Sequence, residues 1–231
     1  MTLSILAFDE KTGAYGGAAT TGSLCVGGWV LRGDAESGMS ASQGSLPSTM
    51  WGTDVLTLMR DGSSAADAVA TVTSADPGRA ERQLAALDPT GGTGHFTGDN
   101  SIPVAEARIA PNVVVTGNLL AAPDVLDACL SGFETADGPL DLRLLAALDA
   151  ASEAGGDSRG LLSAALLVVS RSRPPLTLRV DYSETPLRDL RALHTRARTG
   201  LYGDWVRHVP TLEDPHRAVP FEATQDPITP Q

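Results

Sequence analysis

The sequence is poor in lysine and in aromatic residues, and each shortage narrows what the protein can do. Of its 17 lysine and arginine residues only Lys11 is a lysine, and it lies in a predicted turn. A mechanism that needs a buried lysine as a base therefore has one poor candidate. Aromatic residues make up 4% of the chain, so alanine, leucine and valine must fill most of the core.

Cysteine is also scarce, and long apolar runs are missing. Cys25 and Cys129 are the two cysteines and lie far apart, which is no disulfide framework and predicts two thiols in a reducing cytoplasm. The chain opens with no basic-then-apolar signal segment, and no apolar run is long enough to cross a bilayer. The sequence therefore predicts a cytoplasmic protein without a membrane partner.

Basic charge and metal-binding patterns are likewise in short supply. The formal net charge is -11, which disfavours a polyanion such as nucleic acid as partner. The histidines show no paired spacing and no C-x-x-C occurs, so no metal is expected. The stretch GGTGHFTG lacks the ending of a phosphate-binding loop, and no G-x-S-x-G elbow is present, so neither a cofactor nor an α/β-hydrolase triad is predicted.

The predicted strands come in adjacent pairs that alternate with helices. Predicted strands span residues 2–8, 14–21, 29–33, 37–44, 82–88, 92–98, 105–110, 112–118, 163–170 and 176–182. Helical patterns span residues 48–74, 122–134, 138–156 and 185–198, with Ser64 as a candidate N-cap. This order predicts an α+β domain over residues 1–199, with stacked antiparallel sheets covered by helices. Residues 200–231 are proline-spaced without periodicity and predict an extension.

The opening TLSILAFDEKTGAYGGAATT resembles that of the DUF1028 family. Its members begin Thr-aromatic-Ser-Ile-Val-Ala-Arg-Asp, followed by a Thr-Gly turn. The likeness continues in order through SADPGRAERQ, FTGDNSIP, TGNLLA, GGDSRG, SAALLVV and LRVDYSETPLRDLRALH, over about residues 2–195. The resemblance implies a branch of the N-terminal nucleophile (Ntn) hydrolase superfamily, with a four-layer αββα sandwich. Since Ntn folds often assemble, a homo-oligomer is expected.

Thr2 is the candidate nucleophile that this resemblance implies. A threonine at the start of a chain carries a hydroxyl and a free α-amine, whose ordinary pKa is about 7.7–8.0. That amine can serve as general base at neutral pH, directly or through a water molecule. The expected activity is hydrolysis or acyl transfer at a small polar amide. The alternative is that Thr2 is only the first residue of a strand, in a small-molecule-binding or structural family member without catalysis.

Several residues near Thr2 are candidates for substrate binding. Ser4 lies on the same face of the strand as Thr2, so it either touches the same site or is solvated. Ser23 and Cys25 lie in the glycine-rich link after the second strand, a region that borders the cleft in Ntn folds. Cys25 is either an internal nucleophile or buried packing. Gln43, at the end of the strand over 37–44, completes this group.

Further along the chain, two segments offer groups that could contact a substrate. Arg82 either clamps a substrate carboxylate or pairs with an acidic side chain. In the segment TGN, Gly117 allows close backbone approach and Asn118 can donate to an oxyanion, although turn chemistry also explains both. Asp181, at a strand end, either orients the nucleophile or its amine, or caps the following turn.

The chain departs from the family pattern at two positions. The family usually shows Gln-Gly-Asn where this chain has Thr116 before Gly117, and a glutamine where this chain has Leu162. These departures favour the alternative without catalysis. In GGDSRG, Asp157 and Arg159 form either a structural ion pair or part of a site rim.

Overall fold

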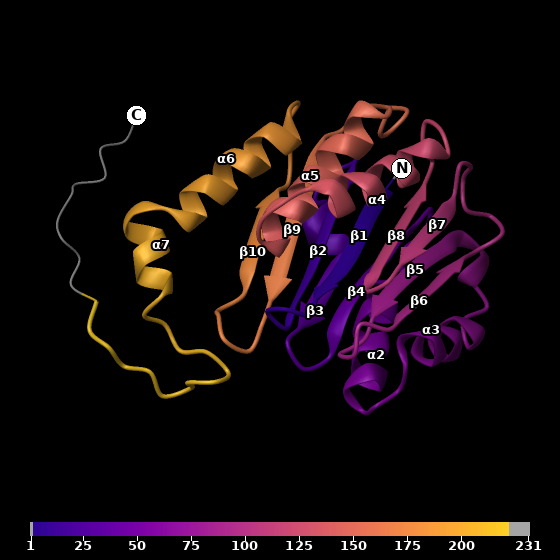
Figure 1. The fold of residues 1–231 in the computed structure, drawn as a ribbon. Helices are drawn as coiled ribbons and strands as arrows, with labels where there is room; N and C mark the ends of the chain where they lie inside the picture. Colours follow the sequence, from indigo (N-terminus) through magenta and orange to yellow (C-terminus); the bar gives the residue numbers. More distant parts are fainter. Residues whose placement is uncertain (1, 222–231) are drawn as a thin grey trace.

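The computed structural model describes residues 2–221 of the chain. One sheet consists of β1 (Thr2–Asp9), β2 (Ala14–Thr21), β7 (Glu106–Ala110), β8 (Val113–Asn118), β9 (Ser163–Val169) and β10 (Leu176–Val180). The other consists of β3 (Leu31–Asp34), β4 (Gly38–Gly44), β5 (Arg82–Leu87) and β6 (Thr93–Thr97). Within the described residues their orders are β10-β9-β2-β1-β8-β7 and β3-β4-β5-β6, and neighbouring strands are antiparallel (Figure 1).

Helices cover the outer face of each sheet. The helices are α1 (Val26–Trp29), α2 (Thr49–Arg60), α3 (Ala65–Ser74), α4 (Asp124–Thr135), α5 (Leu140–Glu153), α6 (Pro186–Arg198) and α7 (Gly200–Val206), with a 3-10 turn at Arg79–Glu81. α4 and α5 pack on the six-stranded sheet and α2 and α3 on the four-stranded one, while the sheets face each other. The predicted α+β class with two antiparallel sheets is confirmed, and the layering is consistent with an αββα sandwich.

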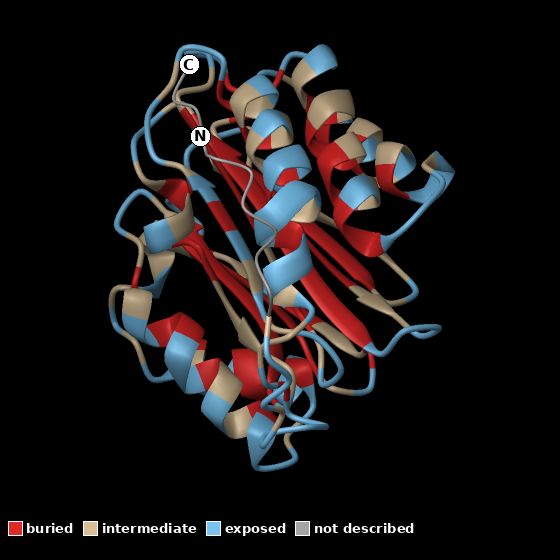
Figure 2. Ribbon diagram, turned by 90° about the vertical axis from the view of Figure 1, so that its left-hand side faces the viewer, coloured by how far each residue is buried: buried red, intermediate tan, exposed pale blue. Residues whose placement is uncertain are grey.

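The alternation of side chains along β1 separates two cores. Leu3 and Ile5 are buried beneath α4 and α5, whereas Leu6 packs between the sheets with Met39 and Val114. Figure 2 shows the buried residues concentrated in the strands and on the helix faces turned toward them. The face of β1 between the sheets is apolar at Leu6 but becomes polar toward the start of the strand. That change places a polar cluster at one end of the space between the sheets.

Two short helices depart from the predicted pattern. α1 lies in the glycine-rich link, and an added Cβ at Gly27 would come within 2.7 Å of Ala165. Close packing against β9 therefore positions this helix, which local sequence alone does not indicate. α7 falls in the predicted extension, whose residues 222–231 lie outside the described residues. The prediction that Ser64 is an N-cap is confirmed for α3, because the Ser64 hydroxyl accepts the N–H of Asp67 at 3.1 Å.

Within residues 2–221, no helix is both long and apolar enough to traverse a bilayer.

Candidate active site

Thr2 is the first residue of a row of polar side chains across the six-stranded sheet. It lies directly opposite Thr21 on β2 and Asn118 on β8. Directly paired residues of an antiparallel sheet project to the same face, so the three side chains lie side by side. In the next row, Ser4 lies opposite Thr116, and their hydroxyl oxygens are 3.0 Å apart. Thr2 and Ser4 thus share one face, and that face is turned toward the other sheet.

Two glutamines on the four-stranded sheet meet this polar face. Gln43 and Gln83 are direct partners in β4 and β5, and Gln43 Nε2 donates to Gln83 Oε1 at 2.7 Å. Gln43 also accepts the Ser4 hydroxyl at 2.9 Å and donates to the carbonyl of Thr2 at 3.2 Å. These amide hydrogen bonds tie the start of β1 to the opposite sheet without any charged group.

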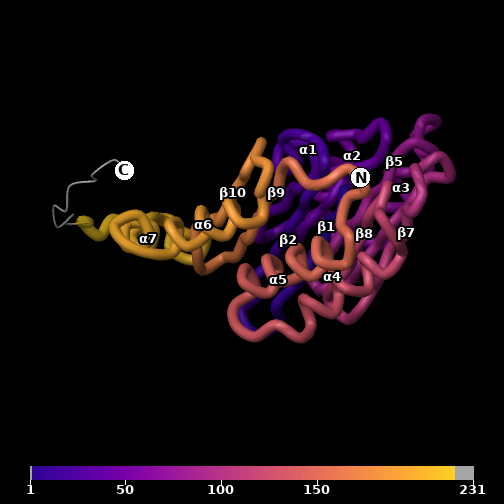
Figure 3. Tube along the Cα trace, turned by 90° about the horizontal axis from the view of Figure 1, so that it is seen from above, coloured from indigo at the N-terminus to yellow at the C-terminus, as the bar shows by residue number. Residues whose placement is uncertain are grey.

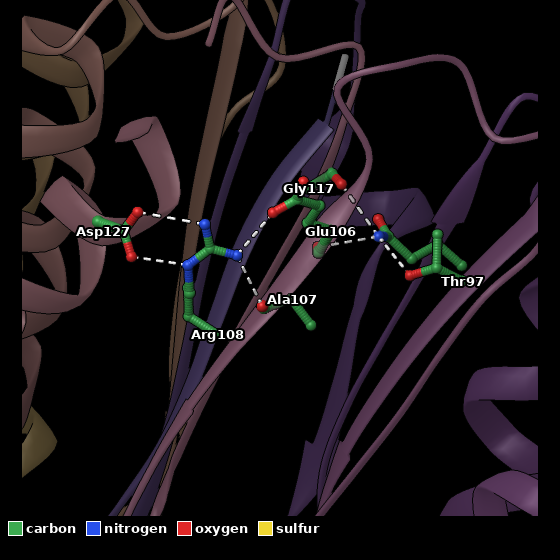
Figure 4. Close-up of polar contacts among 7 residues, drawn as sticks. Thr97, Glu106, Ala107, Arg108, Gly117 and Asp127 are labelled. Atoms are coloured by element: carbon green, nitrogen blue, oxygen red, sulfur yellow. Dashed lines mark hydrogen bonds and ion pairs between the residues drawn. The ribbon is translucent and has the colours of Figure 1, made fainter. Parts of the chain in front are cut away.

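Gln83 is the centre of the cluster. Its Nε2 donates to Thr97 Oγ1 at 3.0 Å, to the carbonyl of Gly117 at 3.0 Å and to that of Glu106 at 3.2 Å (Figure 4). Its Oε1 also accepts from Asn118 Nδ2 at 3.2 Å. Since Gln83 is 0% exposed, water does not compete for these bonds. The side chain that lies beside Thr2, Asn118, is therefore oriented from the opposite sheet.

The strand that carries the Glu106 carbonyl is anchored from its other side. Arg108 bonds both carboxylate oxygens of Asp127 on α4 and the carboxylate of Glu106 (Figure 4). Helix α4 and edge strand β7 are thus held together next to the cluster. This ion-pair network is partly exposed, and its role is to fix backbone position.

A cavity of about 240 Å³ opens beside Thr2. Its polar wall includes Ser23 and Gln43, and Trp29 forms part of an apolar wall. The full lining is Thr2, Thr21, Ser23, Leu24, Val26, Trp29, Val30, Gln43, Gly44, Ser45 and Pro47. Larger cavities lie elsewhere, such as one of about 330 Å³ beside Asp141, but that one does not include the predicted nucleophile. Three candidate residues, Thr2, Ser23 and Gln43, therefore meet at one cavity.

Arg82 is not brought to this cavity. It neighbours Gln83 in β5, and successive residues of a strand face opposite sides. Its guanidinium pairs with Asp76 at 2.5 Å, donates to the carbonyl of Leu46 at 2.9 Å and lies 5.6 Å from the centre of the Trp51 ring. The sequence left two roles open for Arg82, and the structure shows the pairing with an acidic side chain.

Asp181 and Cys25 lie together, away from the polar row. The exposed carboxylate of Asp181 pairs with Arg179 at 2.9 Å, and its carbonyl accepts the N–H of Cys25 at 3.0 Å. Cys25 precedes α1 with a left-handed backbone, at φ 60°. Both cysteines are free thiols, and burial raises the pKa of the Cys129 thiol well above its usual range. Neither Asp181 nor Cys25 contacts Thr2.

Gly117 has a packing role on the other face of the sheet. An added Cβ there would come within 2.9 Å of the Leu120 side chain, so the close approach expected of this glycine is to Leu120. Its carbonyl accepts from Gln83, which links it to the cluster through the backbone.

The sequence left the role of Asp157 open, and the structure contains its ion pair with Arg159. Its Oδ2 accepts the N–H of Gly22 at 2.6 Å and Arg159 at 3.0 Å. Burial by itself raises the pKa of Asp157, but hydrogen bonds from Arg159 and from the Gly22 N–H hold that pKa below its ordinary value. Asp157 is therefore a buried carboxylate at neutral pH.

The sequence contains signals that could have identified Gln83 and Asp157 as buried polar residues with hydrogen-bond partners. Gln83 occupies the position next to Arg82, on the opposite face of the same strand, and a buried glutamine needs partners. Asp157 follows two glycines just before a buried strand, where a carboxylate can reach neighbouring backbone N–H groups. In the part of the chain that the structure describes, no group of three or more His, Cys, Asp or Glu is placed to hold a metal ion.

The fold and this cluster define a class of protein: two facing antiparallel sheets between helices, with a polar site at the start of the first strand. The chain belongs to DUF1028, described as a family of unknown function, whose model matches residues 2–190. It is similar to the protein SPO2555 from Silicibacter pomeroyi, known from a crystal structure that carries the same family designation. The two share 51% identity with a TM-score of 0.91, over 95% of this chain and 99% of that one. Comparison with curated proteins gives no match.

Proposed function

We propose that the protein is an Ntn-type amidohydrolase or acyltransferase that acts on a small polar amide through Thr2. The observation that carries this proposal is the position of Thr2, at the first residue of a central strand, facing between two sheets and lining a cavity. Only a residue at the start of the chain can offer a hydroxyl and an α-amine together. The proposal also includes that the two sheets and their helices form the four-layer αββα sandwich of an Ntn hydrolase.

The reaction requires prior removal of Met1, which lies outside the described residues. The α-amine of Thr2 takes the proton of its own hydroxyl, directly or through a water molecule, as Oγ1 attacks the substrate carbonyl carbon. The carbon–nitrogen bond then breaks, and the leaving amine takes the proton from the α-ammonium. Water, or an acceptor amine in a transferase, next attacks the Thr2 ester and releases the acyl group.

Asn118 is the proposed donor to the oxyanion of the tetrahedral intermediate. It lies directly across from Thr2 and is 6% exposed. Its Nδ2 makes one hydrogen bond, to Gln83, within the described part of the chain, which leaves an N–H for a ligand. A donor held in advance by Gln83 stabilises developing charge without reorganisation in the transition state.

The cavity lining indicates the substrate class. Hydroxyl, amide and apolar side chains share the lining, and no lining residue has a carboxylate, ammonium or guanidinium side chain. A charged substrate would lose hydration there without a counter-charge from any lining side chain. A small neutral polar amide fits this lining best. A cytoplasmic location and a homo-oligomeric state stay predictions from the sequence.

Labelling with a β-lactone electrophile tests the proposal. Protein whose chain begins at Thr2 is incubated with the lactone, and adducts are mapped by peptide mass spectrometry. We expect an adduct on Thr2, none in Thr2→Ala, and retained labelling in Thr2→Ser. An adduct on Ser23 or Cys25 instead would shift the chemistry to an internal nucleophile. Absence of any adduct would reject hydrolysis by this route.

The second candidate is a small-molecule-binding protein without catalysis. The observation that favours it is Thr116, which stands where the family pattern has glutamine and whose hydroxyl bonds Ser4 inside the cluster. Through that bond, Thr116 hydrogen-bonds within the cluster. For this candidate we expect a ligand that binds equally to the native protein and to Thr2→Ala, with no turnover.

A further inference from the structure

Asp157 spans the two neighbours of β1 at the point where β1 begins. β2 continues past Thr21 to Gly22, whose N–H donates to Asp157 Oδ2 at 2.6 Å. β8 continues past Asn118 to Leu120, which forms an antiparallel bridge with the backbone of Asp157. Because β1 lies between β2 and β8, the amino end of Thr2 faces the gap that Asp157 closes.

The approach of this carboxylate depends on a glycine. An added Cβ at Gly22 would lie 2.6 Å from Asp157 Oδ2 and 2.5 Å from the carbonyl of Gly160. The Asp157 side chain is 0% exposed, and burying a carboxylate is costly unless it is paired and hydrogen-bonded. Gly22 and Arg159 supply such partners and keep the carboxylate ionised beside the start of β1.

We infer that Asp157 binds the α-amino group of Thr2 and sets its basicity. This inference deepens the proposed function and rests on it for its catalytic meaning. A carboxylate beside the amine stabilises the ammonium form and raises its pKa above the ordinary 7.7–8.0. Asp157 is thereby a positioning residue that holds the base next to the Thr2 hydroxyl.

Among the described residues, charged side chains from the same loop and from α6 lie near Asp157. Arg159, from the same loop, donates to both carboxylate oxygens, so it competes with the amine for Asp157. Glu184 and Arg188, from the start of α6, line a cavity of about 370 Å³ together with Asp157 and carry opposite charges. On the side of β1, the neighbours Thr21 and Asn118 are uncharged. Asp157 and Arg159 are therefore the charged pair that we expect to act on the amine.

Competitive acylation measures this basicity directly. The full chain is released from a fusion partner so that it begins at Thr2, and it is labelled with isotopic acetic anhydride over a range of pH. Lys11 carries the sole side-chain amine, so it serves as the internal reference. The rate of labelling at Thr2 follows the unprotonated fraction of its α-amine, and its midpoint is the pKa of that amine.

We expect a midpoint above 8 in the native chain. Asp157→Asn keeps an acceptor for Gly22 but loses the charge, and it lowers the midpoint by about one unit or more. Arg159→Gln removes the competing cation and raises the midpoint. Asp181→Asn, the other acid considered for this role, leaves it unchanged.

Unchanged midpoints in both Asp157→Asn and Arg159→Gln would overturn the inference. If Asp157→Asn fails to unfold cooperatively on heating, Arg159→Gln alone decides, because its half-exposed side chain tolerates substitution. The amine titrates whether or not Thr2 reacts. Shifted midpoints without a lactone adduct would support the Asp157–amine pair and reject catalysis by Thr2. An adduct without shifted midpoints would support catalysis by Thr2 and reject the Asp157–amine pair.

Discussion

At the scale of single residues, the site is built from neutral amides rather than charges. Gln43 and Gln83 join β1, β4, β5 and β8 through hydrogen bonds that are shielded from water. Such a network is stable only when each member is satisfied, because an unpaired buried polar group costs about 1–3 kcal/mol. The orientation of Asn118 beside Thr2 therefore depends on its hydrogen bond to Gln83.

Gln83→Leu tests the network. The change keeps apolar volume but leaves the Nδ2 group of Asn118 and the carbonyls of Glu106 and Gly117 without their partner. We expect a loss of about 2–4 kcal/mol in the free energy of unfolding, measured by urea denaturation. Thr97→Val, which removes one partner at the edge of the network, should cost about 1 kcal/mol. Equal losses in the two variants would show that Gln83 is not the centre.

At the scale of elements, a buried acid joins two helices that cover the six-stranded sheet. Asp141 in the first turn of α5 accepts from His194 at 2.9 Å and pairs with Arg198, both on α6. Burial by itself raises the pKa of Asp141, but hydrogen bonds from His194 and Arg198 lower it to about 2. The ionised carboxylate therefore fastens α6 to α5.

This fastening makes stability depend on pH. Because the folded pKa lies below the unfolded value of 3.8, ionised Asp141 stabilises the fold above about pH 4. The stabilisation is lost as the pH falls from about 4 to about 2. We expect Asp141→Asn to lose about 2 kcal/mol at pH 7 and less at pH 3, measured by urea denaturation at both values.

A matched control lies on the same two helices. Asp149 of α5 pairs with Arg191 of α6, but both side chains are partly exposed. Exposed ion pairs contribute about 0–1 kcal/mol, so Asp149→Asn should cost little at either pH. A cost at Asp141→Asn that matched this control would contradict the assigned role of Asp141.

At the scale of the whole molecule, the last described segment stands apart from the two sheets. Figure 3 shows α7 beyond α6, on the far side of β10 from the other strands. α7 exposes Tyr202 and Trp205, whose rings are 5.6 Å apart. A backbone bond from the Glu213 N–H to the Arg171 carbonyl links the segment after α7 to the loop between β9 and β10. Within residues 2–221, the strands and the polar site lie before residue 200.

Truncation tests the predicted boundary after residue 199. We expect the chain 1–199 to unfold cooperatively, with a melting temperature within about 5 °C of the full chain, because it keeps the residues of all three hydrophobic core clusters. A chain ending at residue 185 also loses α6, which exposes core around Asp141, and should lose cooperative unfolding. A full loss of cooperativity already in 1–199 would mean that residues 200–231 are part of the domain.

Local rules account for what the sequence predicted correctly. The hairpin of β1 and β2, the N-cap at Ser64 and the start of α6 at Pro186 depend on residues a few positions apart. The shared face of Thr2 and Ser4 follows from the two-residue period of a strand. The order of strand pairs and helices predicted stacked antiparallel sheets, and the structure confirms two antiparallel sheets.

The sequence by itself thus determined the strands and the longer helices, the polar start of β1 and the membership of DUF1028, because these follow from short-range sterics and from motif order. Only the tertiary structure decided which polar groups meet there. Gln83 comes to the site while its neighbour Arg82 turns outward, and Asp157 approaches Gly22 across 135 positions. Those contacts depend on strand register and sheet packing, which long-range burial sets and local sequence does not encode.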